Sequence, residues 1–222
     1  MRKIVRFLPL LLIIPIYIAL YKIYIPKVNA FGCFDDCFNI VAGYFITNDK
    51  RLYSEIFFNH QPLMAYFSSF IQIVFHPINI YDLVLLHRKS IMLFGLIMNA
   101  IIILRFGMPM VGFVLLYEFS KFYVFGDRFL AEGMVVYPLV YMLGLVWWKY
   151  VKRNLYWYDY ALSSFFAWLV IFMREPYIII SLVLFIIIFF GKPFKKKKKI
   201  ALGIFAILII FFLAITPLRE YF

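Results

Sequence analysis

The stretch PLMAYFSSFIQIVFHP, residues 62–77, decides the topology of the chain. Two prolines bound its apolar segment of 13 residues, Leu63–Phe75, which also carries Ser68, Ser69 and Gln72. An α-helix of that length rises about 20 Å, whereas the hydrocarbon core of a bilayer is about 30 Å thick. We therefore predict an interfacial helix that lies along the membrane surface and does not span it.

The composition is that of a membrane protein. The chain has 222 residues, of which 66% are hydrophobic and 22% aromatic, and its mean hydropathy is +0.93. Soluble domains contain only about 45–50% apolar residues. The net charge of +12 would also suit a nucleic-acid-binding protein. Here, however, the basic residues form short clusters between apolar runs, as cytoplasmic loops do. We expect the lipid bilayer as a partner and no nucleic acid.

Apolar runs of spanning length recur along the chain, and each predicts a transmembrane helix because backbone groups in lipid must bond to one another. The first run follows Arg2, Lys3 and Arg6 and is predicted to be an uncleaved signal anchor. The second can begin as early as Leu83. The predicted fold is an all-α polytopic bundle of about seven spans: 7–25, 90–104, 108–125, 134–148, 158–173, 177–190 and 200–216.

The excess of Lys and Arg on cytoplasmic segments predicts the orientation. The segments expected inside are 1–6, 105–109, 149–154 and 192–199. Those expected outside are 26–89, 126–133, 174–176 and 217–222. Counting 63–75 as a span would move the lysine run at 195–199 outside, which the rule disfavours. The chain is thus predicted to lie in the cell membrane with a cytoplasmic N-terminus.

One transmembrane domain is expected over 1–222, with the signal anchor over 1–25, a long first outer loop over 26–89 and the other spans over 90–222. The chain stops soon after its last span, so we expect a short form or the N-terminal part of a longer protein. The outer loop is the segment expected to hold the chemistry, because a simple connection would be shorter and less aromatic.

Two adjacent aspartates, Asp35 and Asp36, begin this loop in the stretch NAFGCFDDCFNIVAGYF, residues 29–45. Neighbouring carboxylates raise each other's pKa, which suits a catalytic pair, although a solvated loop pair is the alternative. Cys33 and Cys37 flank them. An outer loop permits a disulfide, but the sequence favours two separate thiols.

The order of residues after the aspartates resembles the GT-C superfamily of membrane glycosyltransferases, near the protein O-mannosyltransferases and lipid A aminoarabinose transferases. Those proteins often read Asp-Glu, then Ala, then Gly-x-x-x-Tyr-x-Asp-x-Phe, then His-Pro-Pro. Here Asp35 and Asp36 stand for the acidic pair, Ala42 for the alanine, and residues 50–62 for the second element. The second acid is Asp, no glycine precedes Tyr53, and His-Gln-Pro replaces His-Pro-Pro.

The resemblance implies transfer of a sugar from a polyprenyl-phosphate donor to an acceptor on the outer face, whether protein, lipid or glycan. It implies that Asp35 is the base that activates the acceptor, with Asp36 supporting it. A carboxylate near a second acid has a pKa closer to working pH, as a general base requires.

The second and third outer segments supply further candidates under the same resemblance. Asp127 or Glu132 would assist the active site or a metal, and the alternative is a cluster of helix-end charges. Arg174 is the first candidate for the lipid phosphate and Arg128 the second, because a planar guanidinium donates two parallel hydrogen bonds. An exposed ion pair between Arg174 and Glu175 is the alternative.

Two more groups could contact substrate. Glu118 and Lys121 lie within the third span at i,i+3 spacing, where charged residues either pair or line a cavity. His60 could bind substrate or metal, whereas His76 and His87 are too distant in sequence to suggest a ligand set. No cofactor is certain, and a divalent metal stays open. The competing function is that of a non-enzymatic membrane protein, such as a transporter or flippase subunit or an assembly partner.

Overall fold

The computed structural model describes residues 9–30, 32, 34–124, 126–190 and 196–216. This part of the chain is all-α, and its only β-type pairing is an isolated bridge between Leu52 and Ile56. Four helices are long and apolar enough to cross a membrane, and they cover Pro9–Val28, Ile80–Phe106, Ala131–Tyr150 and Lys198–Ile215. The composition and these helices together indicate a membrane protein.

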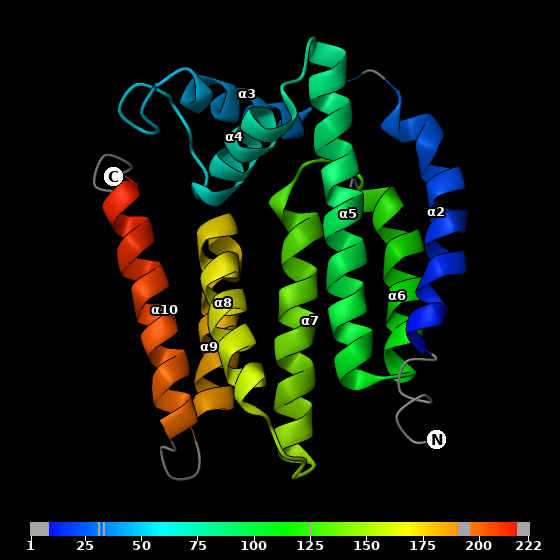
Figure 1. The fold of residues 1–222 in the computed structure, drawn as a ribbon, viewed down its shortest axis with the longest axis vertical. Helices are drawn as coiled ribbons and strands as arrows, with labels where there is room; N and C mark the ends of the chain where they lie inside the picture. Colours follow the sequence, from blue (N-terminus) through cyan, green and yellow to red (C-terminus); the bar gives the residue numbers. More distant parts are fainter. Residues whose placement is uncertain (1–8, 31, 33, 125, 191–195, 217–222) are drawn as a thin grey trace.

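The helices form a bundle whose members run lengthwise and alternate in direction (Figure 1). Each of the apolar runs predicted from the sequence forms one of these helices. They are α2 (Ile13–Val28), α5 (Ile80–Phe106), α6 (Pro109–Ser120), α7 (Ala131–Tyr150), α8 (Trp157–Met173), α9 (Ile178–Phe189) and α10 (Lys196–Ile215). The helices α6 and α9 have only 12 residues each and α8 has 17, so the spanning role of these three stays a prediction.

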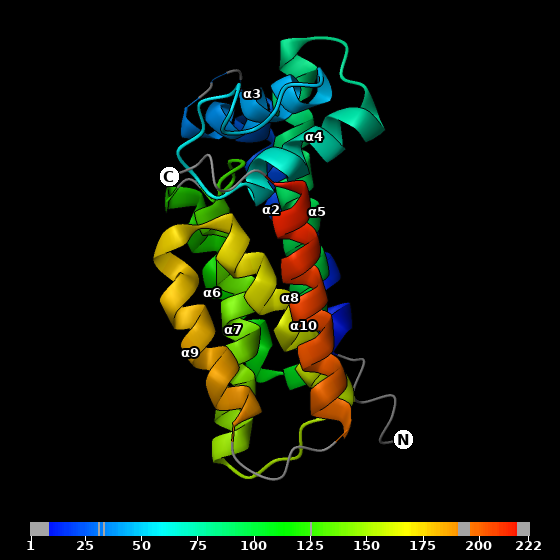
Figure 2. The same ribbon diagram turned by 90° about the vertical axis from the view of Figure 1, so that its left-hand side faces the viewer.

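Two further helices, α3 (Asp35–Thr47) and α4 (Leu63–Phe75), lie across one end of the bundle (Figures 1 and 2). We name it the capped end. The α4 helix has the bounds expected from its flanking prolines, and its orientation is that expected of an interfacial helix. It turns an apolar face outward, including Phe70, Ile73 and Phe75, and buries Ser68 and Gln72 against α3.

The α5 helix begins at Ile80, ten residues before the predicted span at 90 and three before its possible earlier start at Leu83. Asn79 caps the helix, because its side-chain oxygen accepts a hydrogen bond of 2.9 Å from the backbone N–H of Asp82. At 27 residues α5 is about 40 Å long. This is about 10 Å more than a hydrocarbon core of about 30 Å, and at the capped end α5 runs past the ends of α6 and α7 (Figure 1).

A buried ion pair joins α5 to α8 at the opposite end. Arg105 donates to both carboxylate oxygens of Asp159, at 2.5 and 2.6 Å. Asp159 also accepts hydrogen bonds from the hydroxyl of Tyr141 and from the backbone N–H of Tyr156. The guanidinium carbon lies 3.9 Å from the ring centroid of Trp148. The bidentate geometry, the further hydrogen bonds to Asp159 and the Trp148 ring beside the guanidinium together offset the cost of burying two charges.

Replacing Asp159 by Ala should destabilise the bundle, because it leaves Arg105 buried without a counter-charge. We expect a loss of about 3–5 kcal/mol in the free energy of unfolding, measured in detergent micelles. The matched control is Lys50→Gln, which breaks the exposed Lys50–Glu55 pair and should cost less than about 1 kcal/mol. Equal losses in the two variants would contradict a special role for the buried pair.

Candidate active site

A cavity of about 230 Å³ opens at the capped end and is lined by four residues that the sequence marked as site candidates. They are Asp35, His60, Glu132 and Arg174. These residues come from the start of α3, the loop before α4, the start of α7 and the turn after α8. Segments up to 139 positions apart in the chain therefore converge on one small volume.

Local structure explains these positions. Asp35 is the first residue of α3 and Glu132 lies in the first turn of α7, where a helix dipole favours a carboxylate. Arg174 ends α8 with an extended backbone, and Pro176 cannot extend the helix without losing a hydrogen bond. The loop that carries His60 is held by the hydroxyl of Tyr53, which donates to the His60 carbonyl at 2.8 Å.

Arg174 is the centre of the polar contacts in this cavity. Its Nε lies 2.8 Å from Oε1 of Glu132, and its Nη1 donates to Nδ1 of His60 at 2.5 Å. Nη1 also lies 3.8 Å from a carboxylate oxygen of Glu175. The expected Arg174–Glu175 pair thus exists, but it is longer than the pair with Glu132. These three contacts all involve Nε and Nη1.

His60 is held in its neutral form. Burial lowers its pKa, and the positive charge of Arg174 lowers it further, while Glu175, Glu132 and Asp35 act in the opposite direction. A neutral imidazole can accept the hydrogen bond from Arg174, whereas an imidazolium has no free acceptor. The ring also lies edge-on to Phe38 and Phe58. His60 therefore orients the guanidinium without adding charge.

Acidification should weaken this contact. Histidine has an ordinary pKa of about 6.5, so below that pH the unfolded chain binds the proton while His60 in the folded chain resists it. Stability therefore falls as pH falls below about 6.5. Between about pH 7.5 and about pH 5, wild type should lose more thermal stability than His60→Gln. Parallel melting curves for the two proteins across this range would contradict the proposed neutral histidine.

The two adjacent aspartates are separated by the structure. Asp35 is exposed at the cavity, whereas Asp36 is fully buried and does not line it. Asp36 accepts a hydrogen bond of 2.9 Å from the backbone N–H of Phe34 and lies 3.9 Å from Arg88. Arg88 donates to four backbone carbonyls between residues 27 and 32. Asp36 is thus part of a connection between α2 and α3.

The structure also distinguishes the acids of the second outer segment. Glu132 lines the cavity, while Asp127 is buried and does not. Arg128 lies over the ring of Phe34, with 4.9 Å from its guanidinium carbon to the ring centroid, and it does not line the cavity either. Asn39, which the sequence analysis did not select, lines the cavity and donates to the carbonyl of Phe129 at 3.0 Å.

Glu118 and Lys121 form the pair that their spacing suggested, at 2.6 Å. Both are buried, and Glu118 also accepts hydrogen bonds from Asn99 and Tyr137, each at 2.6 Å. Neither lines the cavity around Asp35. Their contacts within the described residues support structural pairing inside the bundle.

The metal and cysteine expectations have different outcomes. The part of the chain that the structure describes contains no group of three His, Cys, Asp or Glu residues that could hold a metal ion. His87 is buried in α5, where its Nε2 lies 2.7 Å from the hydroxyl of Ser68. Cys37 is disulfide-bonded, so the expectation of separate thiols is wrong for it. Cys33 lies outside the described residues.

Comparison with family models, curated proteins and solved structures found no match for this chain. The resemblance to the GT-C superfamily therefore rests on the residues quoted from the sequence.

Proposed function

We propose that the protein is a GT-C-like membrane glycosyltransferase that moves a sugar from a polyprenyl-phosphate donor to an acceptor at the outer membrane face. The observation that carries the proposal is the convergence of Asp35, His60, Glu132 and Arg174 on one cavity. An exposed carboxylate opposite a guanidinium supplies the two groups that this reaction needs, a base and a partner for the phosphate.

In the proposed reaction the acceptor oxygen attacks the anomeric carbon of the sugar. Its proton passes to Asp35 while the bond between that carbon and the phosphate oxygen breaks. The electron pair leaves with the polyprenyl phosphate, and Arg174 offsets the charge through its Nη2 edge. His60 and Glu132 keep the guanidinium in position, since they contact its other nitrogens. The spans hold the donor lipid within reach of the cavity.

One observation favours the competing function, that of a non-enzymatic multi-pass protein. Arg174 already has a carboxylate and an imidazole as partners. A cluster of this kind is sufficient to join α7, α8 and the first loop, and it needs no catalytic role to do so. In that case the four residues contribute to stability alone. Transfer activity and stability must therefore be measured on the same variants.

Asp35→Asn should lower glycosyl transfer by about 10²–10⁴-fold, the usual contribution of a general base. The assay supplies a polyprenyl-phosphate sugar to membranes that contain the variant. Asp35 is exposed, so the melting temperature should barely change. The matched control is Asp49→Asn in the same loop, where a backbone φ of 61° is one that Asn tolerates; its activity should equal that of wild type.

Unchanged transfer in Asp35→Asn would refute the assignment of Asp35 as base. Absence of transfer in wild type with all polyprenyl-phosphate sugars, together with a clear loss of stability in Arg174→Ala, would favour the non-enzymatic function instead.

The proposed orientation puts the capped end outside. A cysteine introduced at Ser54, an exposed loop position, should react with an impermeant maleimide in intact cells. A cysteine introduced at Asn154, in the exposed turn between α7 and α8, should react only after the membrane is opened. The reverse pattern would place the lysine-rich end outside and exclude the proposed site from the outer face.

A further inference from the structure

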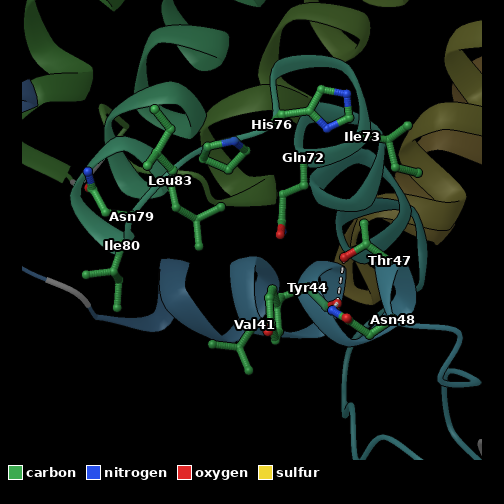
Figure 3. Close-up of a pocket in the computed structure, with 12 residues that line it drawn as sticks. Val41, Tyr44, Thr47, Asn48, Gln72, Ile73, His76, Asn79, Ile80 and Leu83 are labelled. Carbon is green, nitrogen blue, oxygen red and sulfur yellow. Dashed lines mark hydrogen bonds between the residues drawn. The ribbon is translucent and has the colours of Figure 1, made fainter.

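A second and larger hollow lies between α3, α4 and the first turn of α5, with a volume of about 690 Å³. In Figure 3 the side chains of α3 face those of α4 and α5 across this groove. Val41, Ile73 and Leu83 give it an apolar lining, and the polar side-chain groups around it are amides, two hydroxyls and an imidazole. No Asp, Glu, Lys or Arg of the described residues lines it.

The groove is separate from the cavity at Asp35. Successive residues of an α-helix are rotated by about 100°, so Val41 and Tyr44 lie on the side of α3 opposite to Asp35 and Asn39. Between these two sides runs the stripe that contacts α4. There a Cβ added at Gly43 would lie 2.3 Å from the hydroxyl oxygen of Ser68. The close contact of α3 with α4 leaves the two hollows without a shared lining residue.

The groove includes Leu83 and the residues just before it, in the part of α5 that runs past α6 and α7 at the capped end (Figure 1). With the apolar helices as spans, this part of α5 is expected near the level where lipid headgroups meet acyl chains. The exposed apolar face of α4 continues outward from the groove with Phe70, Ile73 and Val74. Helices with such a face bury it about 5–10 Å into the boundary between headgroups and chains. The opening of the groove is therefore continuous with lipid.

We propose that this groove binds a zwitterionic phospholipid of the surrounding bilayer, which joins α3 to α4 and α5 from outside. The upper part of one acyl chain would pack against Val41, Ile73 and Leu83. Asn48 and Asn79 lie at two edges of the lining. One amide hydrogen of each is already bonded, to the Tyr44 carbonyl and to the Asp82 carboxylate, and the second would donate to the ester and phosphate oxygens. The uncharged lining has no ion-pair partner for an anionic headgroup, and it suits a lipid whose net charge is zero. The groove has the size of a ligand pocket.

The lipid acts on α3 and not on substrate. A molecule in the groove is on the far side of α3 from Asp35, so it cannot supply the reacting sugar. It fills the hollow between α3, α4 and the start of α5. The inference does not depend on the proposed transferase activity, because the groove and its lipid exist whether or not Asp35 is catalytic.

The test uses the full-length protein in nanodiscs of phosphatidylcholine that contains a photoreactive diazirine in the upper part of one acyl chain. After illumination, adducts are located by peptide mass spectrometry. We expect adducts concentrated on residues 41–48 and 73–83. Val41→Trp fills the groove from α3 and should lower these adducts at least five-fold. The matched control is Leu115→Trp on α6, where the side chain is 40% exposed against 46% for Val41, and it should leave them unchanged.

A second variant, Ile73→Trp, blocks the groove from α4, so that the test does not depend on correct folding of Val41→Trp alone. Each variant is used only after its circular dichroism spectrum matches that of wild type. Adducts spread evenly over all exposed helix faces, or adducts that resist both blocking substitutions, would overturn the proposal. Cross-links between two copies of the chain at these residues would overturn it in favour of a dimer interface. Asp35→Asn should retain all groove adducts, which separates this test from that of the transferase.

Discussion

Arg88 of α5 connects the segment after α2 to the start of α3, on which the candidate site depends. Its guanidinium donates to four carbonyls in the segment after α2 and lies beside the buried carboxylate of Asp36. These carbonyls include groups left free where a helix ends, and they need donors. The same contact fixes where α3 begins. Because Asp35 is the first residue of α3, a cation on α5 determines where the proposed base points.

The same constraint, that a polar group in an apolar bundle must find its partner inside the protein, recurs at two other levels. The Glu118–Lys121 pair connects α6 and η1 (Lys121–Val124) to α7 through Tyr137. The Arg105–Asp159 pair connects α5 to α8 at the opposite end. Each buried charge joins elements that apolar packing alone would leave free to slide. The three connections together fix the relative heights of the helices, and thereby the convergence at the capped end.

The sequence predicted the lengthwise helices and α4 well, because apolar runs and flanking prolines act locally. It left the start of α5 open between Leu83 and residue 90, because polar residues such as His87 and Arg88 lower the hydropathy, and the helix begins at Ile80, after the Asn79 cap. Arg88 had a usable signal, since a cation in a spanning helix needs a partner. Nothing local, in contrast, distinguishes Glu132 from Asp127. Their difference arises from the turn before α7, which buries one acid and aims the other at Arg174.

The charges around Arg174 limit how the proposed donor can bind. Asp35 and Glu132 bring two carboxylates to the cavity and Arg174 brings one cation, so a phosphate that approached at random would be repelled. A neutral His60 matters in this setting, because it holds the guanidinium without adding a third negative charge. The Nη2 amino group, which none of these contacts uses, is the part of the guanidinium that we propose meets the donor phosphate. If the donor phosphate binds there, its sugar is directed toward Asp35. The two carboxylates that repel a misplaced phosphate then orient the donor in the cavity.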